Sequence, residues 1–367
     1  MKILYVITRS DWGGAQAHLF DLIREAKQKG YSCSVVVGEE GEFFNRVKEL
    51  GIYPIYLKNL VHPIRPLKDF MATIKLTRII NEIKPDVIHL HSSKAGVIGR
   101  IAGAISKVPV IFTAHGWAFS EGVSSKRKAI AIPIEKGMGY LSDNIICVSE
   151  YDKQLALQNK ISTRKKLVTI YNGVKDKQMH ENNNSKRNDI LKVIMVARFS
   201  YPKDYETLIR AVDALDIPIE VNLLGNGDLQ DQMKKLANDL GVCNKVNFLG
   251  MQRDVTKYLA ESDVFILTTN YEGLPISIIE AMQQSLPIIA TNVGGVGELV
   301  EHGENGFLIA KQDVKGVVKY LEKFNEDRIL AKRMGKVSRR KYEEAFDLEI
   351  CMEKTFEVYQ KVIKSNG

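Results

Sequence analysis

The chain has 367 residues and a mass of 41.3 kDa, which is enough for two domains of ordinary size. Hydrophobic residues make up 45% and charged residues 26%, a globular composition that excludes a disordered chain. The net charge is +8 and the isoelectric point about 9.0, so an acidic partner such as a nucleic acid, an anionic lipid or a phosphorylated substrate is considered. Residues 1–173 hold 25 Lys and Arg against 15 Asp and Glu, a net of +10, so the basic surface is expected there.

Cysteine spacing and hydropathy predict a cytoplasmic protein. The sequence contains four widely separated cysteines, with no metal-ligand spacing and no disulfide pattern: Cys33, Cys147, Cys243 and Cys351. The apolar run at the N-terminus ends at Arg9 and is too short for the core of a signal peptide. The longest apolar stretch, residues 97–114, is interrupted by Arg100 and Lys107, so no membrane-spanning helix is expected.

Short apolar runs alternate with amphipathic segments along residues 1–174, the first predicted domain. Helices are expected over residues 15–29, 67–83 and 94–106. Strands are expected over residues 3–7, 33–37, 52–57, 87–90, 110–113, 145–148 and 167–170. Nearly all-apolar strands separated by helices predict a parallel sheet covered on both faces.

A polar stretch at residues 175–190 interrupts this pattern and is predicted to be a linker or an exposed loop. The alternation then restarts over residues 191–345, the second predicted domain. Its strands are expected over residues 192–197, 220–224, 246–249, 264–267, 287–290 and 306–309. Residues 346–367 have an apolar helical face and are predicted to dock on the first domain. The prediction is therefore an α/β protein with two doubly wound domains facing a cleft, and ligands at the carboxyl ends of the strands.

Glycines and histidines mark candidate sites in the first domain. Gly13 and Gly14 follow the first strand, where they either let backbone N–H groups approach a ligand or simply form a tight turn. His115 follows a strand directly, and this position favours a place in the cleft. His89 and His91 are two residues apart, so one ring is expected on each side or both in the loop. Without a third ligand nearby, they do not favour a metal site.

Two cations follow the first strand of the second domain. Arg198 and Lys203 stand at a strand end with no nearby acid expected to pair with them, and two such cations suit a diphosphate. The next strand ends at a glycine turn around Asn226, which would let a nucleotide lie close to the backbone.

The strongest signal lies in residues 270–290. Glu272 follows a strand, Pro275 suits the first turn of the next helix, and Glu280 comes one and a half turns later. The backbone N–H groups expected to point at an anion belong to Gly273, Leu274 and Ile276. Carboxylates accept hydrogen bonds from sugar hydroxyls, so the pattern suits a phosphate with hydroxyl-rich groups on either side.

These motifs come in the order found in the family 4 retaining glycosyltransferases, which the chain resembles from end to end. The motifs are Gly13-Gly14, His115-Gly116, residues 148–150 and 172–174, Arg198 with Lys203, Glu272 with Glu280, and residues 291–298. Ala197 stands where the family usually has a glycine before the arginine. Residues 85–96 and 112–116 resemble the capsule and exopolysaccharide branch of the family.

The resemblance implies the GT-B architecture: two Rossmann-like domains, with the acceptor on the first, the nucleotide sugar mainly on the second, and a C-terminal helix crossing back. It implies transfer with retention of configuration, without a metal or other cofactor. The partners that it implies are a nucleotide-diphosphate sugar, expected to be a UDP-sugar, and a polyprenyl-diphosphate-linked saccharide, with no nucleic acid. Alternatives are a sugar-nucleotide 2-epimerase of the same architecture, a transferase with a soluble acceptor, and a non-catalytic binding protein.

The resemblance also implies roles for single residues. Arg198 and Lys203 would bind the diphosphate and stabilise the charge on the leaving nucleotide. Glu272 would hold the donor sugar together with the amides that follow it, and Glu280 would hold the ribose. The remaining positions implied to contact the donor are His115 at the sugar near its 6-position, Gly14 at the phosphate, and Arg253 beside the base.

Basic residues beside apolar ones suggest contact with a membrane. One group is Lys68, Lys75 and Arg78, and the other is Lys126, Arg127 and Lys128 ahead of the apolar residues 129–134. Such segments suit an interfacial helix on anionic lipid, although the solvated faces of ordinary helices explain the charges equally well. Together with the resemblance, they predict a cytoplasmic protein that is peripheral on the inner face of the cell membrane.

Overall fold

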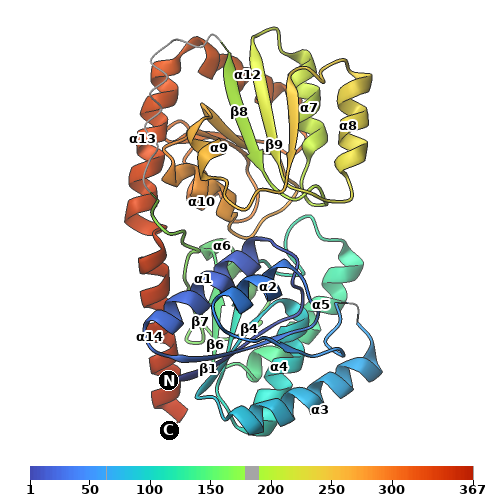
Figure 1. Cartoon of the computed structure of the whole chain (residues 1–367), viewed down its shortest axis with the longest axis vertical. Helices are drawn as coiled ribbons and strands as arrows, with labels where there is room; N and C mark the ends of the chain where they lie inside the picture. The colour runs from blue at the N-terminus through green and yellow to red at the C-terminus, as the bar shows by residue number, and fades with distance from the viewer. Residues whose placement is uncertain (63, 178–189, 367) are drawn as a thin grey trace. The chain divides into compact units, whose positions relative to one another are not determined.

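The structure is a computed structural model that describes residues 1–62, 64–177 and 190–366 (Figure 1). The chain divides into two compact units, one formed by residues 1–172 with 349–367 and the other by residues 173–348. Each unit contains one sheet in which all strands are parallel. This arrangement confirms the predicted fold class of two α/β domains.

The sheet of the first unit has the strand order β3-β2-β1-β4-β5-β6-β7. Its strands are β1 (Lys2–Ile7), β2 (Ser32–Val37), β3 (Ile55–Tyr56), β4 (Val87–His91), β5 (Val110–Ala114), β6 (Asn144–Cys147) and β7 (Leu167–Thr169). All seven predicted strands form, although the third is limited to two residues. The central strands are fully buried, as expected for a sheet covered on both faces.

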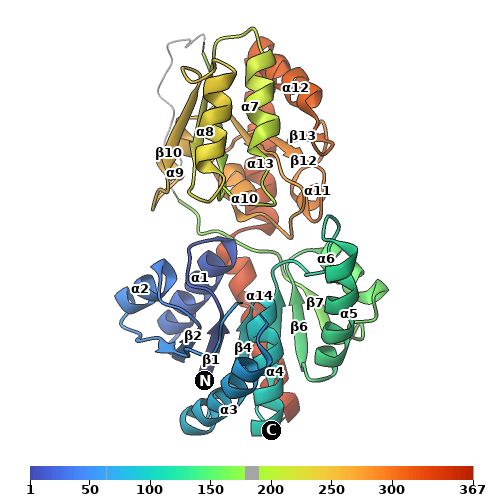
Figure 2. The same ribbon diagram turned by 90° about the vertical axis from the view of Figure 1, so that its right-hand side faces the viewer.

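Helices cover both faces of this sheet (Figure 2). They are α1 (Gly14–Gln28), α2 (Glu42–Glu49), α3 (Pro66–Ile83), α4 (Ser93–Ser106), α5 (Ser125–Tyr140), α6 (Glu150–Gln158) and the C-terminal α14 (Leu348–Asn366). Alternate residues of β4 face opposite sides, because a strand has a period of two. Leu90 therefore lies against Gly99 of α4, whereas His89 contacts Tyr359 of α14.

Helix α14 packs on the first unit, as the sequence predicts. The Tyr359 hydroxyl lies 2.5 Å from His89 Nδ1, and the Phe356 ring meets the Tyr31 ring edge-on at 5.6 Å. Near the end of the helix, Asn366 Nδ2 donates to Asp143 Oδ1 at 3.3 Å. Buried aromatic contacts of this kind hold the chain's last helix against residues near its beginning.

The sheet of the second unit has the strand order β10-β9-β8-β11-β12-β13. Its strands are β8 (Leu191–Val196), β9 (Ile219–Leu224), β10 (Val246–Gly250), β11 (Val264–Leu267), β12 (Ile288–Thr291) and β13 (Gly306–Ile309). Its helices are α7 (Tyr205–Ala214), α8 (Gln230–Asp239), α9 (Thr256–Ala260), α10 (Ile276–Gln283), α11 (Val296–Leu299), α12 (Val314–Glu326) and α13 (Arg328–Ala345). The order changes direction around β8 and β11, where doubly wound sheets bind ligands.

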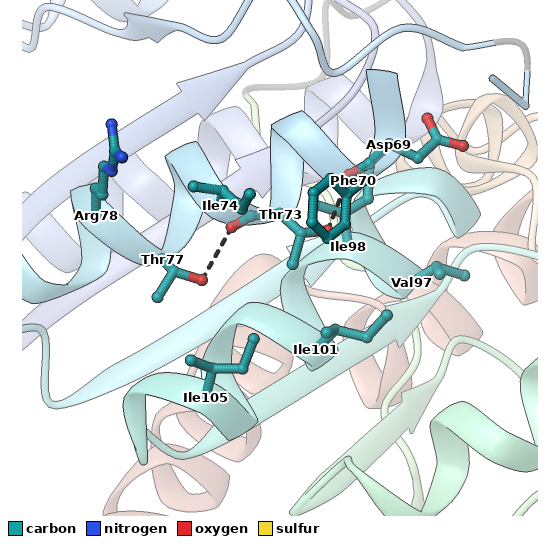
Figure 3. Close-up of a pocket in the computed structure, with 10 residues that line it drawn as sticks. All are labelled: Asp69, Phe70, Thr73, Ile74, Thr77, Arg78, Val97, Ile98, Ile101 and Ile105. Atoms are coloured by element: carbon teal, nitrogen blue, oxygen red, sulfur yellow. Dashed lines mark hydrogen bonds between the residues drawn. The ribbon is translucent and has the colours of Figure 1, made fainter. Parts of the chain in front are cut away.

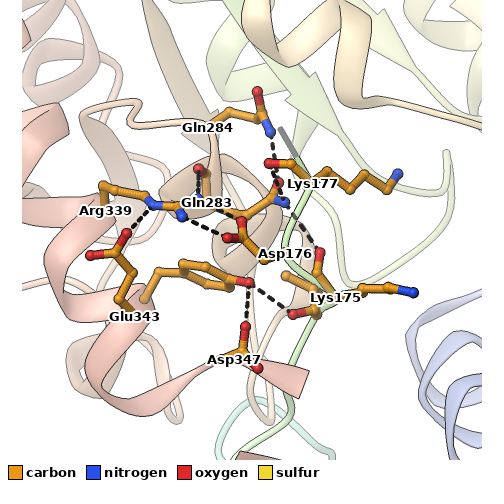
Figure 4. Close-up of polar contacts among 10 residues, drawn as sticks. Lys175, Asp176, Lys177, Gln283, Gln284, Arg339, Glu343 and Asp347 are labelled. Carbon is orange, nitrogen blue, oxygen red and sulfur yellow. Dashed lines mark hydrogen bonds and ion pairs between the residues drawn. The ribbon is translucent and has the colours of Figure 1, made fainter. Parts of the chain in front are cut away.

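The predicted linker at residues 175–190 lies mainly on residues 178–189, which are outside the described part of the chain. Its first residues are held within the second unit (Figure 4). Both terminal nitrogens of Arg339 donate to the carboxylate of Asp176 at 2.8 Å, and this hydrogen bonding lowers the pKa of Asp176. Gln283 Nε2 donates to the Lys175 carbonyl at 3.2 Å. Among the helices of the described residues, none is long and apolar enough to cross a membrane.

Candidate functional site

Two loops of the second unit join at the carboxyl ends of the neighbouring strands β8 and β11. The backbone N–H of Asp204 donates to the Thr268 carbonyl at 3.0 Å, and that of Asn270 donates to the Pro202 carbonyl at 2.9 Å. Between these contacts, Lys203 and Thr269 form an antiparallel bridge. The two loops therefore behave as one short ribbon that fixes the side chains at the edge of the sheet.

This ribbon brings Lys203 against Glu272, and the two side chains form an ion pair. The Thr269 hydroxyl donates to the same carboxylate oxygen, Oε1, at 2.8 Å. The expectation that no acid pairs with Lys203 is therefore wrong, because Glu272 lies 69 positions away in the sequence but on an adjoining loop. An ammonium has three donors, so Lys203 can hold Glu272 and still bind a phosphate oxygen.

A third loop, after β12, supports Glu272 from its backbone. The Gly295 N–H donates to the Gly273 carbonyl at 2.9 Å. Gly294 has a φ of 54°, and a Cβ there would lie 1.9 Å from the Glu272 carbonyl oxygen. A glycine allows this close approach in the left-handed region, which explains the glycine at position 294.

The start of α10 differs slightly from the prediction. Pro275 is the N-cap residue and not part of the first turn, and Ile276 is the first helical residue. Leu274 is buried, whereas Gly273 and Ile276 are partly exposed. Glu280 is partly exposed on α10 and its carbonyl accepts from the Gln284 N–H at 3.2 Å.

The other predicted donor residues lie on loops at the same edge of this sheet. Arg198 is exposed in the loop after β8, next to the fully buried Phe199. The Phe199 N–H donates to the Asn226 carbonyl at 2.9 Å, which joins this loop to the one after β9. Asn226 and Arg253 are exposed, Arg253 on the loop after β10. The structure thus gathers Lys203 with Glu272 directly and places Arg198, Asn226 and Arg253 along the same row of strand ends.

The first unit has a different arrangement at the carboxyl ends of its strands, where four histidines pack together. His91 Nδ1 lies 2.9 Å from His115 Nε2, and their rings are stacked with centroids 5.2 Å apart. His18 of α1 meets the His115 ring edge-on at 5.3 Å, and the His89 ring lies 4.2 Å from that of His91. His89 and His91 therefore share one side of β4, and the expectation of one ring on each side is wrong because residues two apart on a strand face the same way.

Burial keeps these imidazoles neutral. It lowers the pKa of His18 to about 4 and holds the pKa values of His89, His91 and His115 well below the ordinary value. His89 uses both ring nitrogens, since Nε2 also lies 2.7 Å from the Thr113 hydroxyl. A neutral imidazole has one donor and one acceptor nitrogen, so each contact fixes the role of the other nitrogen. The described residues contain no group of three or more His, Cys, Asp or Glu side chains that could hold a metal ion.

Gly14 is exposed as the first residue of α1, one turn before His18 of the histidine cluster. The basic residues are on two helices: Lys68, Lys75 and Arg78 on α3, and Lys126, Arg127 and Lys128 in the first turn of α5. Sequence reasoning missed His18, because a lone histidine within a helix gives no sign of the strand ends it contacts.

Solved structures with the same arrangement of strands and helices define the fold. HepE from Anabaena, determined in complex with UDP and glucose, has a TM-score of 0.83 and 23% identity over 98% of this chain and 99% of that one. Sucrose-phosphate synthase from Thermosynechococcus elongatus has a TM-score of 0.84 and 19% identity over 99% of both chains. The fold is that of the two-domain GT-B glycosyltransferases.

The family follows from the sequence comparisons. The model described as Glycosyltransferase Family 4 matches residues 12–178, and the model described as Glycosyl transferases group 1 matches residues 176–341. The chain belongs to glycosyltransferase family 4 and is a glycosyltransferase.

Curated relatives are similar over most of the chain. An Escherichia coli UDP-Gal:alpha-D-GlcNAc-diphosphoundecaprenol alpha-1,3-galactosyltransferase is 28% identical over 90% of this chain and 89% of its own length. The capsular polysaccharide biosynthesis glycosyltransferase CapM of Staphylococcus aureus is 25% identical over 87% of this chain and 88% of its own.

Proposed function

We propose that the protein transfers a sugar from a UDP-sugar to a saccharide carried on polyprenyl diphosphate, during the synthesis of a cell-surface polysaccharide. The observation that carries the proposal is the Lys203–Glu272 pair at the strand ends of the second sheet, beside the start of α10. The name of the E. coli relative supports this choice of donor and acceptor, and the UDP and glucose in the HepE complex support the donor.

In the proposed reaction, the bond between the sugar's anomeric carbon and the diphosphate breaks on the same face on which the acceptor oxygen attacks. Because attack and departure occur on the same face, configuration is retained without a protein nucleophile. The acceptor hydroxyl loses its proton to the leaving phosphate oxygen. Lys203 and Arg198 stabilise the negative charge that develops on the diphosphate, the largest contribution expected from the protein. Glu272 accepts hydrogen bonds from the donor sugar, and Glu280 from the ribose. No metal or other cofactor takes part in this scheme.

A donor screen tests the proposal. Radiolabelled UDP-sugars are incubated with lipid-linked saccharides, and the configuration of the product is read by NMR. We expect transfer with retention that continues in EDTA, and Glu272→Gln to reduce it far more than Glu301→Gln, a matched change at an exposed carboxylate.

Three outcomes would contradict the scheme. Transfer that EDTA abolishes and a divalent cation restores would make a metal necessary. Conversion of the UDP-sugar to its epimer without acceptor would favour the epimerase alternative. Equal activity of the two glutamate variants would remove Glu272 from the donor site.

The proposed location is peripheral, on the inner face of the cell membrane. Lys126, Arg127 and Lys128 occupy the first turn of α5, where the positive end of the helix dipole disfavours cations, so an external anion would be stabilised there. Ile130 beside them is 59% exposed. Each basic residue near an anionic surface contributes about 1 kcal/mol.

Co-sedimentation with vesicles containing anionic lipid tests this location. We expect salt-sensitive pelleting of the wild type and its loss when Lys126, Arg127 and Lys128 are all changed to Glu. The matched control changes three exposed lysines of the second unit, Lys234, Lys235 and Lys257, to Glu and should still pellet. Equal pelleting of all three proteins, or none by any at low salt, would instead favour a soluble acceptor.

A further inference from the structure

A groove with a volume of about 540 Å³ lies between α3 and α4 of the first unit (Figure 3). This volume lies within the range of small-molecule sites, roughly 300–1,000 Å³. Phe70 and Ile74 of α3 form one wall, and Ile98, Ile101 and Ile105 of α4 line the other side. Phe70 is 67% exposed and Ile74 is 40% exposed, so the groove leaves large apolar side chains in contact with water.

The groove follows from the sequence of α4. Gly96, Gly99 and Gly103 face the sheet, and a Cβ on Gly99 would lie 2.3 Å from Leu90 Cδ2. The missing side chains let α4 approach the sheet more closely than a helix with larger residues there could. The outer face of α4 therefore lines a groove beside α3. The three glycines are explained by this close packing of α4 on the sheet.

The middle of the groove offers an apolar surface. Asp69 and Arg78 stand at the two ends of its α3 wall, and the polar side chains between them are Thr73 and Thr77, whose hydroxyls donate within α3 to the carbonyls of Asp69 and Thr73, both at 2.9 Å (Figure 3). A polypeptide or a saccharide lying there would bury polar groups without receiving hydrogen bonds from these hydroxyls, and such burial is unfavourable. A hydrocarbon chain has no such groups.

One end of the groove has the opposite character. Asp69 Oδ2 lies 2.5 Å from Lys94 Nζ, and Asp69 Oδ1 is buried without a hydrogen-bond partner among the described residues. Helix α4 begins two residues after His91, so this end lies at the strand ends that carry His91 and His115. Lys68 of α3 lies in the same turn as Asp69. A polar, negatively charged head group with hydroxyl donors suits this end, and an apolar tail suits the rest.

We propose that the groove holds the hydrocarbon chain of the acceptor's polyprenyl carrier, with the diphosphate and the sugar at the Asp69–Lys94 end. This assignment rests on the proposed function, which makes the acceptor a lipid-linked saccharide. The hydrocarbon of the carrier would cover Phe70 and Ile74 and remove their apolar surface from water, which is the main source of its affinity. The head group is thereby presented at the strand ends where the histidines lie.

The test compares two acceptors that carry the same saccharide diphosphate. One has a chain of a few isoprene units that is soluble without detergent or membrane, and the other has only a methyl group. Ile74→Gln removes an apolar wall of the groove, and Leu67→Gln is its matched control, since Leu67 is 83% exposed on the same helix but does not line the groove. Both positions are exposed, so both variants should fold.

We expect the wild type to have the lower KM for the isoprenoid acceptor, and Ile74→Gln to raise that KM roughly tenfold, as partial loss of one buried aliphatic contact predicts. The KM of Ile74→Gln for the methyl acceptor should equal that of the wild type. Leu67→Gln should have the wild-type KM for both acceptors. Equal KM values of the wild type for both acceptors would overturn the proposal. Equal effects of the two variants would assign α3 to bilayer insertion instead.

Binding of a dansyl-labelled isoprenyl diphosphate, followed by fluorescence without any donor, separates this proposal from the proposed function. If neither acceptor is glycosylated but the probe binds and Ile74→Gln weakens its binding, the groove assignment stands and the proposed function fails. If transfer occurs but the probe binds both variants equally, the groove assignment fails alone.

Discussion

Each unit has a parallel sheet with candidate functional side chains at the carboxyl ends of its strands, yet the side chains at the two sets of strand ends differ in chemistry. In the first unit, four histidines pack on one another and on the hydroxyls of Thr113 and Tyr359. In the second unit, Lys203 and Glu272 form an ion pair among glycine-rich loops. His89 and His91 are fully buried, whereas the side chains of Lys203 and Glu272 remain 16% and 12% exposed.

Desolvation explains this difference. A histidine can be buried as a neutral ring at modest cost, because it gives up its proton, whereas a buried ion pair loses the hydration of both charges. At the first edge, His115 is the one partly exposed ring of the four, so it is the neutral imidazole that can meet a sugar hydroxyl there. The second keeps its charges near water, where a diphosphate can exchange places with solvent. The comparison teaches that the fold sets where ligands bind, whereas burial sets which charge the site carries.

The largest effect that sharpens this comparison is on stability in acid. The pKa of His18 is lowered to about 4 in the folded state, so between that pH and its ordinary value near 6.5 the unfolded chain binds more protons. The stability from the neutral ring is complete above about pH 6.5 and is lost as pH falls toward 4, about 3 kcal/mol for His18 alone. His89, His91 and His115 act in the same direction. We expect the free energy of unfolding of the first unit to fall over this range.

Urea unfolding followed by tryptophan fluorescence measures this for the first unit alone, since the two tryptophans of the sequence, Trp12 and Trp117, both lie there. His18→Gln should bind about one proton fewer on unfolding in the acid range. The control His302→Gln, in the second unit, should leave the slope unchanged. If His18→Gln kept the wild-type pH dependence, burial of a neutral His18 would not be the cause of the loss of stability in acid.

Much of this fold is predictable from the sequence, because parallel strands in covered sheets are short apolar runs. All the predicted strands form, and helices α1, α3 and α4 begin within a residue of expectation. The short α2 and α6 were not predicted, since 8 and 9 residues give little periodic signal. Residues 52–57 shrink to β3, a two-residue strand at the edge of the sheet.

Single site residues are predictable from the sequence, but the contacts between them are not. Glu272 and Lys203 were each placed at a strand end, but their pairing depends on β8 and β11 being neighbours, which the order of elements along the chain does not reveal. His18 joins His91 and His115 from a helix near the N-terminus, through tertiary packing alone. The roles of Arg198, Lys203, Glu272 and His115 in the reaction stay predictions.

A smaller effect, on the reaction rate, tests whether the charged side chains at the strand ends of the second sheet act on the diphosphate. Lys203→Ala and Arg198→Ala should each lower kcat about a hundredfold, close to 3 kcal/mol of transition-state stabilisation, because we propose that each cation faces the charge on the leaving diphosphate. Lys257→Ala, at an exposed lysine of the same unit, is the matched control. Glu272→Gln breaks the ion pair from its other side, so the double variant of Lys203 and Glu272 should lose less than the two single losses combined. Wild-type turnover by folded Lys203→Ala and Arg198→Ala proteins would show that the strand ends of the second sheet do not stabilise the leaving diphosphate, and their contrast with the histidine cluster would then be structural only.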